Sequence, residues 1–453
     1  MKIPMKPPSQ LELTKALSGS SPDQIIRMIT MGIGPELNSR YFHWDELRHR
    51  QPPQGLSHEE WWFAIKQARS VIRKNLNLKD QQDDEFGLVL TEGLQRKLHK
   101  IDRDAAGTIQ MDAPISTRET RDRYLIRSLF EEAITSSQLE GASTTTSEAR
   151  NMLRSGRKPR DRSEQMIFNN YRAMQFVREN RSKPLSESLL LELHDKVTYN
   201  SMDIPDASGR WRKASEDIIV VSARDGTVLH RPPHADLIPD RMKKLIEFAN
   251  SDQDSSFIHP VIRAVVLHFM LSFEHPFTDG NGRTARALFY WYMIRNEYWL
   301  IEFVSISKVI KSAPTKYAKA FLYTETDEND LTYFLHHQLD VIIKSINDLH
   351  KYLAIKAKEL QVTEQLLRGP VQRVLNHRQV SLITHALKHP DYLYEIQSHK
   401  TSHAVTYQTA RTDLLDLEEL GLLQKFKRGK AFVFQSPTDI SERITQLNQE
   451  LIN

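Results

Sequence analysis

Two apolar segments separated by a short polar loop constrain the fold of this chain more than any other part of it. The first, Val261 to Phe273, is too long for a typical strand, and its apolar residues recur at helical spacing. Pro276 follows it and discourages continuation of a helix. A second helical pattern begins near Gly282 and includes Arg283, Arg286, Leu288, Phe289, Tyr292 and Ile294. The sequence therefore predicts a helix, a loop and a second helix in direct succession.

The residues from His275 to Arg286 are suited to phosphate binding. Gly280 and Gly282 permit positive φ and close backbone approach, so their amides can turn toward an anion at a helix N-terminus. Arg283 and Arg286 are three positions apart and therefore near one another on a helix surface, where they can clamp a phosphate chain. The combination predicts a phosphate site.

Two further residues of this stretch add a base and a metal ligand. His275 has an ordinary pKa near neutrality and can take a proton from an attacking hydroxyl. Asp279 is a hard oxygen ligand suited to Mg²⁺ (or Mn²⁺), and Mg²⁺ usually combines few carboxylates with substrate phosphates. Each residue alone is unremarkable, so the prediction rests on their combination.

Two common nucleotide-binding motifs do not account for this stretch. Gly280 to Ala285 formally matches the dinucleotide fingerprint G-x-G-x-x-A, and Glu302 lies about 20 residues further on. That fingerprint requires a buried strand directly before it, whereas a predicted helix and a polar loop precede Gly280. The P-loop pattern G-x-x-x-x-G-K-[ST] does not occur in the chain.

Composition indicates a soluble globular protein of 453 residues, with about three domains on the length prior. The 62 basic and 58 acidic residues give a net charge of only +4, so any nucleic-acid binding requires a local patch. The absence of cysteine excludes disulfides and thiolate metal sites. Without a visible secretory signal or an apolar run of about 20 residues, we expect a cytoplasmic protein with no membrane partner.

Residues 1–117 are predicted to form a helical N-terminal module without recognisable chemistry. A capping box at Ser57 predicts the start of one helix. Lys79 to Asp84 is a polar break. A second amphipathic helix is predicted after it, with the apolar positions Leu88, Leu90, Leu94, Leu98 and Ile101.

A helix at about residues 125–141 is predicted to end at Gly141, a residue that tolerates a left-handed cap. Glu140 would then lie at the negative end of the helix dipole, which is mildly unfavourable. This position alone is typical of an ordinary exposed residue, but it favours a cationic partner elsewhere in the chain.

Two β-branched runs around a short turn predict a β-hairpin. The first run is Ile218, Ile219, Val220 and Val221. The turn contains Asp225 and Gly226, and the second run is Thr227 to Leu229. An isolated hairpin is marginally stable, so it must pack on other elements. Its edge can accept an extended peptide as an extra strand, although a purely structural hairpin is equally consistent with the pattern.

Residues 351–365 are predicted to form a linker helix, and residues 366–453 resemble a winged helix-turn-helix domain. The segment Ser402 to Leu420 is the predicted recognition helix. Two predicted strands after it flank the basic tip Lys427 to Lys430. Such domains bind DNA through a major-groove helix and phosphate contacts. A protein-interaction or dimerisation module, and hence a homodimer, is the alternative.

The stretch His275 to Arg286 matches the Fic-domain signature HxFx(D/E)GNGRxxR at every fixed position, so residues 118–350 resemble a Fic domain. The expected fold is mainly α, a helical Fic core with a small hairpin flap. The resemblance implies transfer of AMP from ATP to a Tyr, Ser or Thr hydroxyl of a target protein, with release of pyrophosphate. It implies that the hairpin resembles the family's flap, which clamps the target segment by strand addition.

The resemblance also assigns roles within the loop. It implies that His275 is the general base and that Asp279 holds the metal. It implies phosphate contacts for Gly280, Asn281, Gly282, Arg283 and Arg286, the last of them to the γ-phosphate.

The family's inhibitory motif (S/T)xxxE(G/N) is matched by Ser136 to Gly141. By this resemblance, Glu140 pairs with Arg286 and denies it to the γ-phosphate of ATP. Three alternatives remain open at this point. They are a DNA-binding regulator whose Fic-like core senses nucleotide, an enzyme that removes AMP, and transfer of another phosphate-containing group.

Overall fold

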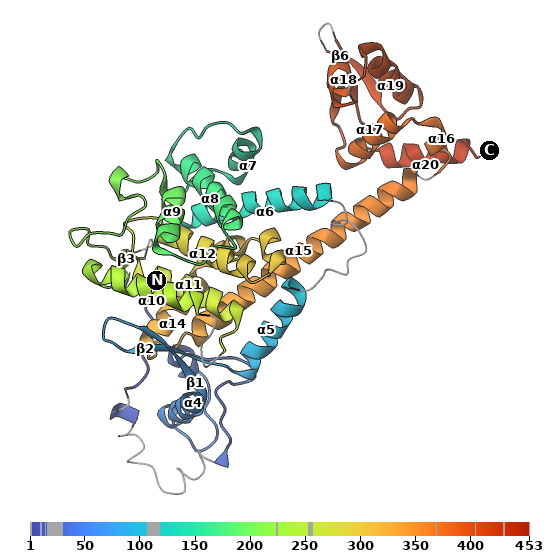
Figure 1. Ribbon diagram of the computed structural model, residues 1–453. Coiled ribbons are helices and arrows are strands. Elements are labelled where there is room, and N and C mark those ends of the chain that lie inside the picture. The colour runs from blue at the N-terminus through green and yellow to red at the C-terminus, as the bar shows by residue number, and fades with distance from the viewer. Residues whose placement is uncertain are drawn as a thin grey trace. The chain divides into compact units, whose positions relative to one another are not determined.

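The computed structural model describes residues 2–9, 11–13, 15, 30–106, 118–222, 225–251, 257–367, 369–403, 405–428 and 431–452. It is mainly helical, as predicted, and its described part contains three small antiparallel sheets (Figure 1). The chain divides into two compact units, Met1–Leu349 and His350–Asn453. The predicted boundary at residue 117 lies outside the described residues. No described helix has both the length and the apolar character needed to cross a membrane.

Two buried helices form the centre of the first unit. They are α11, Pro260–Glu274, and α12, Asn281–Arg295, which confirms the predicted succession of helix, loop and helix. α11 is apolar on nearly every face, and a helix of this kind must be covered on all sides, whereas α12 combines apolar residues with a buried polar first turn. Accordingly, nearly every residue of both helices is buried.

The helices around this pair hold the rest of the site. Their bounds are α6 Arg118–Leu139, α7 Thr146–Ser155, α8 Arg162–Glu179, α9 Glu187–Thr198, α10 Ile238–Asn250, α13 Ile306–Ser312 and α14 Pro314–Thr326. The predicted helix at about 125–141 is confirmed as α6, and Gly141 after it has the left-handed φ of 94°. Short 3₁₀ turns cover Pro205–Ala207, Ala235–Leu237 and Trp299–Phe303.

The N-terminal region differs from the prediction. The capping box at Ser57 is present and begins α4. The predicted second helix is wrong in its first part, because Leu88 lies on a strand and Leu90 lies between that strand and the helix. The elements are α3 Trp44–Leu47, α4 His58–Ile72, β1 Arg73–Lys79, β2 Glu85–Val89 and α5 Glu92–Ala105.

Distant contacts explain why β2 is a strand. The ring of Phe86 packs edge-on against Phe269 and Phe273 of α11, with centroids 5.6 and 5.1 Å apart. The amide of Gly87 donates to the Asn329 carbonyl at 3.2 Å, and the Gly87 carbonyl accepts from Leu331 at 2.8 Å. These partners are far away in sequence, so local periodicity could not indicate them.

The predicted hairpin is confirmed, but it is shorter than expected. Its strands are β3, Val220–Val221, and β4, Val228–His230, which pair antiparallel (Figure 1). Ile218 and Ile219 precede β3 and lie outside the strand. Within the described residues this sheet has two strands, so β3 has a strand neighbour on one side only.

The helix α15, Thr332–Leu367, continues past the predicted boundary of the Fic-like region at residue 350 and includes the predicted linker helix. The second unit then contains α16 Val371–Val374, α17 His377–Lys388, β5 Leu393–Glu395, α18 Ile396–His403, α19 Tyr407–Glu419, β6 Gln424–Arg428, β7 Ala431–Gln435 and α20 Ile440–Glu450. The three strands form one sheet in the order β5-β7-β6. An apolar core of its own, including Leu414, Leu417 and Phe434, holds this unit together.

The predicted continuous helix from Ser402 to Leu420 is wrong. Two helices, α18 and α19, replace it, and Thr406 caps the second with its side chain accepting from the Thr409 amide at 3.1 Å. An N-cap residue has extended backbone geometry, which interrupts the helix. At the predicted basic tip, Gly429 and Lys430 lie outside the described residues.

Candidate active site

The loop between α11 and α12 is held in one conformation by its own residues. His275 ends α11 with a left-handed φ of 47°, and Gly280 begins α12 with a φ of 80°. A Cβ atom on Gly280 would lie 2.6 Å from Cγ2 of Thr198, so glycine is required there. The Asn281 side chain accepts from the Phe277 amide at 3.0 Å and donates to the Phe277 carbonyl at 2.8 Å. In this structure the Asn281 amide therefore braces the loop, and its contact with phosphate remains a prediction.

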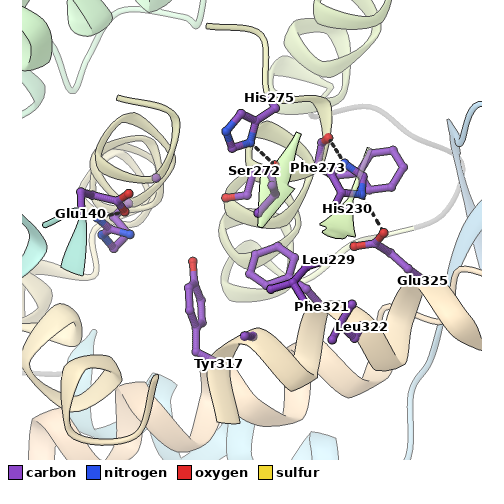
Figure 2. Close-up of a pocket in the computed structure, with 14 residues that line it drawn as sticks. Glu140, Leu229, His230, Ser272, Phe273, His275, Tyr317, Phe321, Leu322 and Glu325 are labelled. Atoms are coloured by element: carbon purple, nitrogen blue, oxygen red, sulfur yellow. Dashed lines mark hydrogen bonds and ion pairs between the residues drawn. The ribbon is translucent and has the colours of Figure 1, made fainter. Parts of the chain in front are cut away.

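His275 presents one ring nitrogen as a base. Its Nδ1 lies 3.0 Å from the Ser272 carbonyl oxygen, which can only accept, so Nδ1 carries the proton (Figure 2). In the neutral ring the lone pair is then on Nε2. Burial lowers the pKa of His275, which favours this neutral form at neutral pH.

Asp279 provides a partly exposed carboxylate beside α12, the helix that carries Arg283 and Arg286. Its oxygens lie 3.6 Å from Nη2 of Arg162 and 3.5 Å from Nη2 of Arg283. Among the described residues no group of three or more His, Cys, Asp or Glu forms a metal cage. A single hard carboxylate beside a phosphate site fits Mg²⁺, which takes its other ligands from substrate and water.

Arg283 is fully buried and incompletely paired. Its Nη1 donates to the Val197 carbonyl at 3.1 Å. Its Nε and Nη2 have no hydrogen-bond partner in the described part of the chain. Burial lowers the pKa of Arg283. Buried guanidinium donors are rarely left unpaired, so this side chain is arranged for an anionic ligand.

Arg286 is fully engaged by α6 and the residues that follow it. Its Nε donates to Ser136 Oγ at 2.8 Å, and its Nη2 donates to the Ser136 carbonyl at 3.0 Å. The same Nη2 lies 2.8 Å from Oε1 of Glu140. The structure thus brings together the three residues of the predicted inhibitory contact, and the inhibitory role itself remains a prediction.

Gly282 makes room for this contact. A Cβ atom on Gly282 would lie 2.2 Å from Oε1 of Glu140. The carboxylate of Glu140 therefore lies against the first turn of α12, where the helix dipole favours an anion. Glu140 and a bound phosphate would compete for the same charged environment.

Two residues that the sequence did not indicate position the loop. His194 of α9 stacks on Phe277 with ring centroids 3.6 Å apart, and its Nε2 donates to the Asp279 carbonyl at 2.9 Å. Burial lowers the pKa of His194 to about 4, so it acts as a neutral donor. Arg212 donates from Nε to the His275 carbonyl at 2.9 Å.

A cavity of about 220 Å³ lies beside the base, between the flap and α14 (Figure 2). Most of its wall is apolar, and the residues that line it include Val220, Leu229, Phe273, Tyr317, Phe321 and Leu322. Tyr317, whose hydroxyl lies 2.8 Å from Nε2 of His268, is one wall of this slot. Tyr323, on the same helix as Tyr317, does not line the slot, and its ring stacks on His43 with centroids 4.3 Å apart.

A helical core, a histidine with a free ring nitrogen, a buried arginine with two donors that make no hydrogen bond to the described residues, and a glycine-rich loop at a helix N-terminus together suit phosphate binding. Residues 184–293 match the Fic/DOC family. The chain therefore carries a Fic domain.

Known proteins resemble the chain over different extents. It is 28% identical to a protein adenylyltransferase Fic of Drosophila grimshawi over 273 residues, 58% of this chain and 51% of that protein. It is 33% identical to protein adenylyltransferase fic-1 of Caenorhabditis elegans over 109 residues, 24% of this chain and 19% of that protein. The alignments thus span about half of the relatives' length or less.

A crystal structure of a Fic family protein from Desulfovibrio desulfuricans G20 has the same fold. The superposition has a TM-score of 0.50 at 18% identity and covers 76% of this chain and 95% of that chain.

Proposed function

We propose that this protein is a protein adenylyltransferase that moves AMP from ATP onto a Tyr, Ser or Thr hydroxyl of a target protein, and that Glu140 inhibits it. The observation that carries the proposal is the site itself. A neutral base, His275, lies beside the phosphate-type loop, and Arg286 of α12 is occupied by the carboxylate of Glu140. The names of the relatives that match 58% of the chain support the same activity.

In the proposed reaction, Nε2 of His275 removes the proton from the target hydroxyl as its oxygen attacks the α-phosphorus of ATP. An oxygen–phosphorus bond forms, the bond between the α-phosphorus and its bridging oxygen breaks, and pyrophosphate leaves. General-base help of this kind contributes about 10²- to 10⁴-fold to a rate. His275 is suited to it because its Nδ1 is held by Ser272.

The remaining residues bind and orient ATP. The Arg283 donors Nε and Nη2, which make no hydrogen bond to the described residues, and the amides at the start of α12 suit the phosphates. Asp279 would hold Mg²⁺ or Mn²⁺, which when bound neutralises phosphate charge. The apolar slot walled by Tyr317 and Leu229 has the surface to take the adenine ring.

Inhibition follows from the occupation of Arg286. While Glu140 holds its Nη2, that group cannot bind the γ-phosphate, and ATP lacks one of the contacts that would align its α-phosphorus. A carboxylate at this position also repels the phosphate chain.

The test is transfer of labelled AMP from ATP to proteins of a cell lysate. We expect Glu140→Gly to increase the transfer at least about tenfold, because it frees Arg286 and removes a negative charge. His275→Ala should abolish transfer in the Glu140→Gly background. Equal labelling by Glu140→Gly and the unaltered protein would refute the inhibition, and labelling that survives His275→Ala would refute the base.

We propose DNA binding by the second unit as an additional function. The order α17, β5, α18, α19, β6, β7 with one three-stranded sheet is typical of winged helix-turn-helix domains. The first turns of α19 expose Gln408 and Arg411, whereas Ala410 and Leu414 face the core. Exposed amide and guanidinium groups in this part of a recognition helix suit base edges.

Fluorescence anisotropy with a labelled duplex from the region upstream of the protein's own gene tests this second proposal. Binding should weaken as salt rises, and Arg411→Gln should reduce affinity by about 1 to 3 kcal/mol if it reads a base. Lys388→Gln, an exposed lysine on α17, is the matched control. Equal losses in both variants, or no binding at low salt, would contradict the proposal.

A further inference from the structure

His230 joins the flap to the body of the Fic domain. It is the last residue of β4 and lies opposite Val220 of β3 in the hairpin register. Its side chain is only 10% exposed and lines the cavity beside His275. Figure 2 shows the ring between the end of α11 and Glu325 of α14. None of the catalytic steps above uses this buried imidazole.

The two contacts of the His230 ring determine its charge. Its Nε2 lies 2.7 Å from the Phe273 carbonyl oxygen, which can only accept a hydrogen bond. Its Nδ1 lies 2.7 Å from Oε2 of Glu325, and an ionised carboxylate also only accepts. Both ring nitrogens therefore carry protons, and the ring is an imidazolium paired with Glu325.

Loss of this charge would weaken the contact. A neutral ring that still donates to Phe273 would direct the Nδ1 lone pair at the Glu325 carboxylate, and the two would repel. Burial alone would lower the pKa of His230, but the Glu325 carboxylate and the Phe273 carbonyl outweigh it, so the pKa is raised. Glu274, which is paired with Arg241 of α10, also raises the pKa of His230, and the neutral ring of His275 lies nearby.

The flap has other attachments, but they do not depend on a proton in this way. Nε2 of Gln81 donates to the Arg231 carbonyl at 2.6 Å. Arg212 donates to the Pro233 carbonyl. Gln81 is uncharged and arginine stays protonated at all physiological pH values. His230, by contrast, lies on β4 itself, where it is paired with Val220 of β3.

We propose that His230 is a positioning residue: its ion pair with Glu325 fixes the flap to α14, and its hydrogen bond to the Phe273 carbonyl fixes the flap to the end of α11, two residues before the proposed base. This inference rests on the proposed function, because it assigns the fixed flap a purpose. The edge of β3, which would receive the target strand, is then held at a fixed position relative to Nε2 of His275. Deprotonation of His230 releases β4 and loosens that edge.

Hydrogen exchange and imidazole NMR on the full chain test the proposal without any catalysis. In protein labelled with nitrogen-15 histidine, the His230 ring should show the imidazolium signals at about pH 7, where an ordinary histidine is mostly neutral. Exchange of the β3 and β4 amides, corrected for intrinsic pH effects, should be about tenfold faster in His230→Gln. It should accelerate similarly in Glu325→Gln, which removes the charge from the other partner.

His234→Gln is the matched control, because His234 lies four residues further on and its side chain is 63% exposed. It should leave flap exchange unchanged. A neutral His230 ring at about pH 7 would overturn the proposal, and so would unchanged flap exchange in both pair variants. Equal acceleration by His234→Gln would overturn it as well. Since no readout uses AMP transfer, these outcomes are separate from a failure of the proposed function.

Discussion

The proposed role of His275 as the base requires its ring to stay neutral although charged groups lie nearby. Burial lowers the pKa of His275 from its ordinary value of 6.5, and the nearby His230 charge acts in the same direction. Protonation would place a proton on Nε2 and remove the lone pair that accepts the target's proton. Activity should therefore persist as pH falls below 6.5 and disappear only when pH passes below the lowered pKa.

The pH dependence of kcat/KM in the Glu140→Gly protein measures this, since the acid limb reports the base of the free enzyme. His230→Gln removes a neighbouring positive charge and should move the acid limb to higher pH. An acid limb centred above 6.5 in the Glu140→Gly protein would show that His275 is not the group that must be neutral.

Single residues of the loop could be predicted because their requirements are local. Gly280 must adopt a positive φ, and the residues from His275 to Arg286 form one contiguous motif. The positioning residues could not be predicted in this way. His194 is 85 residues from its partner Asp279, and on its own helix it is one more buried position among leucines.

At the scale of elements, the helix that leads to Glu140, the proposed inhibitory residue, is fixed by a buried carboxylate. Glu132 of α6 is 2% exposed and accepts from Ser305 Oγ at 2.8 Å, the Ser307 amide at 3.1 Å and the Tyr290 hydroxyl at 3.0 Å. These partners lie on α12 and in the first turn of α13 with its N-cap residue. Glu140 is thus held in place partly by contacts made two turns earlier in the same helix.

Glu132→Ala should lower the free energy of unfolding by about 3 kcal/mol, because it leaves buried donors unpaired and opens a cavity. It should also increase AMP transfer, although less than Glu140→Gly, since a loosened α6 holds Glu140 less firmly. Urea unfolding and labelled ATP measure the two effects.

Glu131→Ala is the control for this prediction. Glu131 neighbours Glu132, but its carboxylate pairs with Arg150 at 3.1 Å and with the more exposed Lys308 at 3.5 Å. Ion pairs of this kind contribute about 1 kcal/mol or less. A destabilised Glu132→Ala protein without increased transfer would mean that inhibition depends on the last turn alone.

Elements with strong helical periodicity were predicted well, whereas elements defined by distant partners were not. The pattern of α11 and α12 is decided by burial along their own length. The strand β2 contains Leu88, which fits a helical pattern equally well, and its hydrogen bonds to Asn329 and Leu331 decide the outcome. The same reasoning applies to the break before α19, where the cap of Thr406 outweighs an apolar pattern that runs through it.

At the scale of the whole molecule, a buried arginine joins the N-terminal region to the Fic domain within the first unit. Arg69 of α4 donates to the Phe42 carbonyl at 2.8 Å and the Pro35 carbonyl at 3.1 Å. It also donates to the Tyr333 hydroxyl of α15 at 2.8 Å. Its guanidinium lies 3.8 Å from the buried carboxylate of Asp327. One side chain thus links three parts of the chain that are far apart in sequence.

Arg69→Met keeps much of the side-chain volume but removes the donor to the Pro35 carbonyl and the Tyr333 hydroxyl. The Phe42 carbonyl keeps only the Tyr333 hydroxyl at 3.3 Å as a donor among the described residues. Removing one partner of a buried charged network typically costs about 3 to 5 kcal/mol. We expect the amides of β1 and β2 to exchange at least about tenfold faster in this variant, while those of α11 and α12 change less. Arg96→Met is the control, because Arg96 is 75% exposed and its ion pair is with the exposed Glu92 at 3.4 Å. If β1 and β2 exchange equally in the two variants, the packing of Phe86 on α11 holds the N-terminal region without help from Arg69.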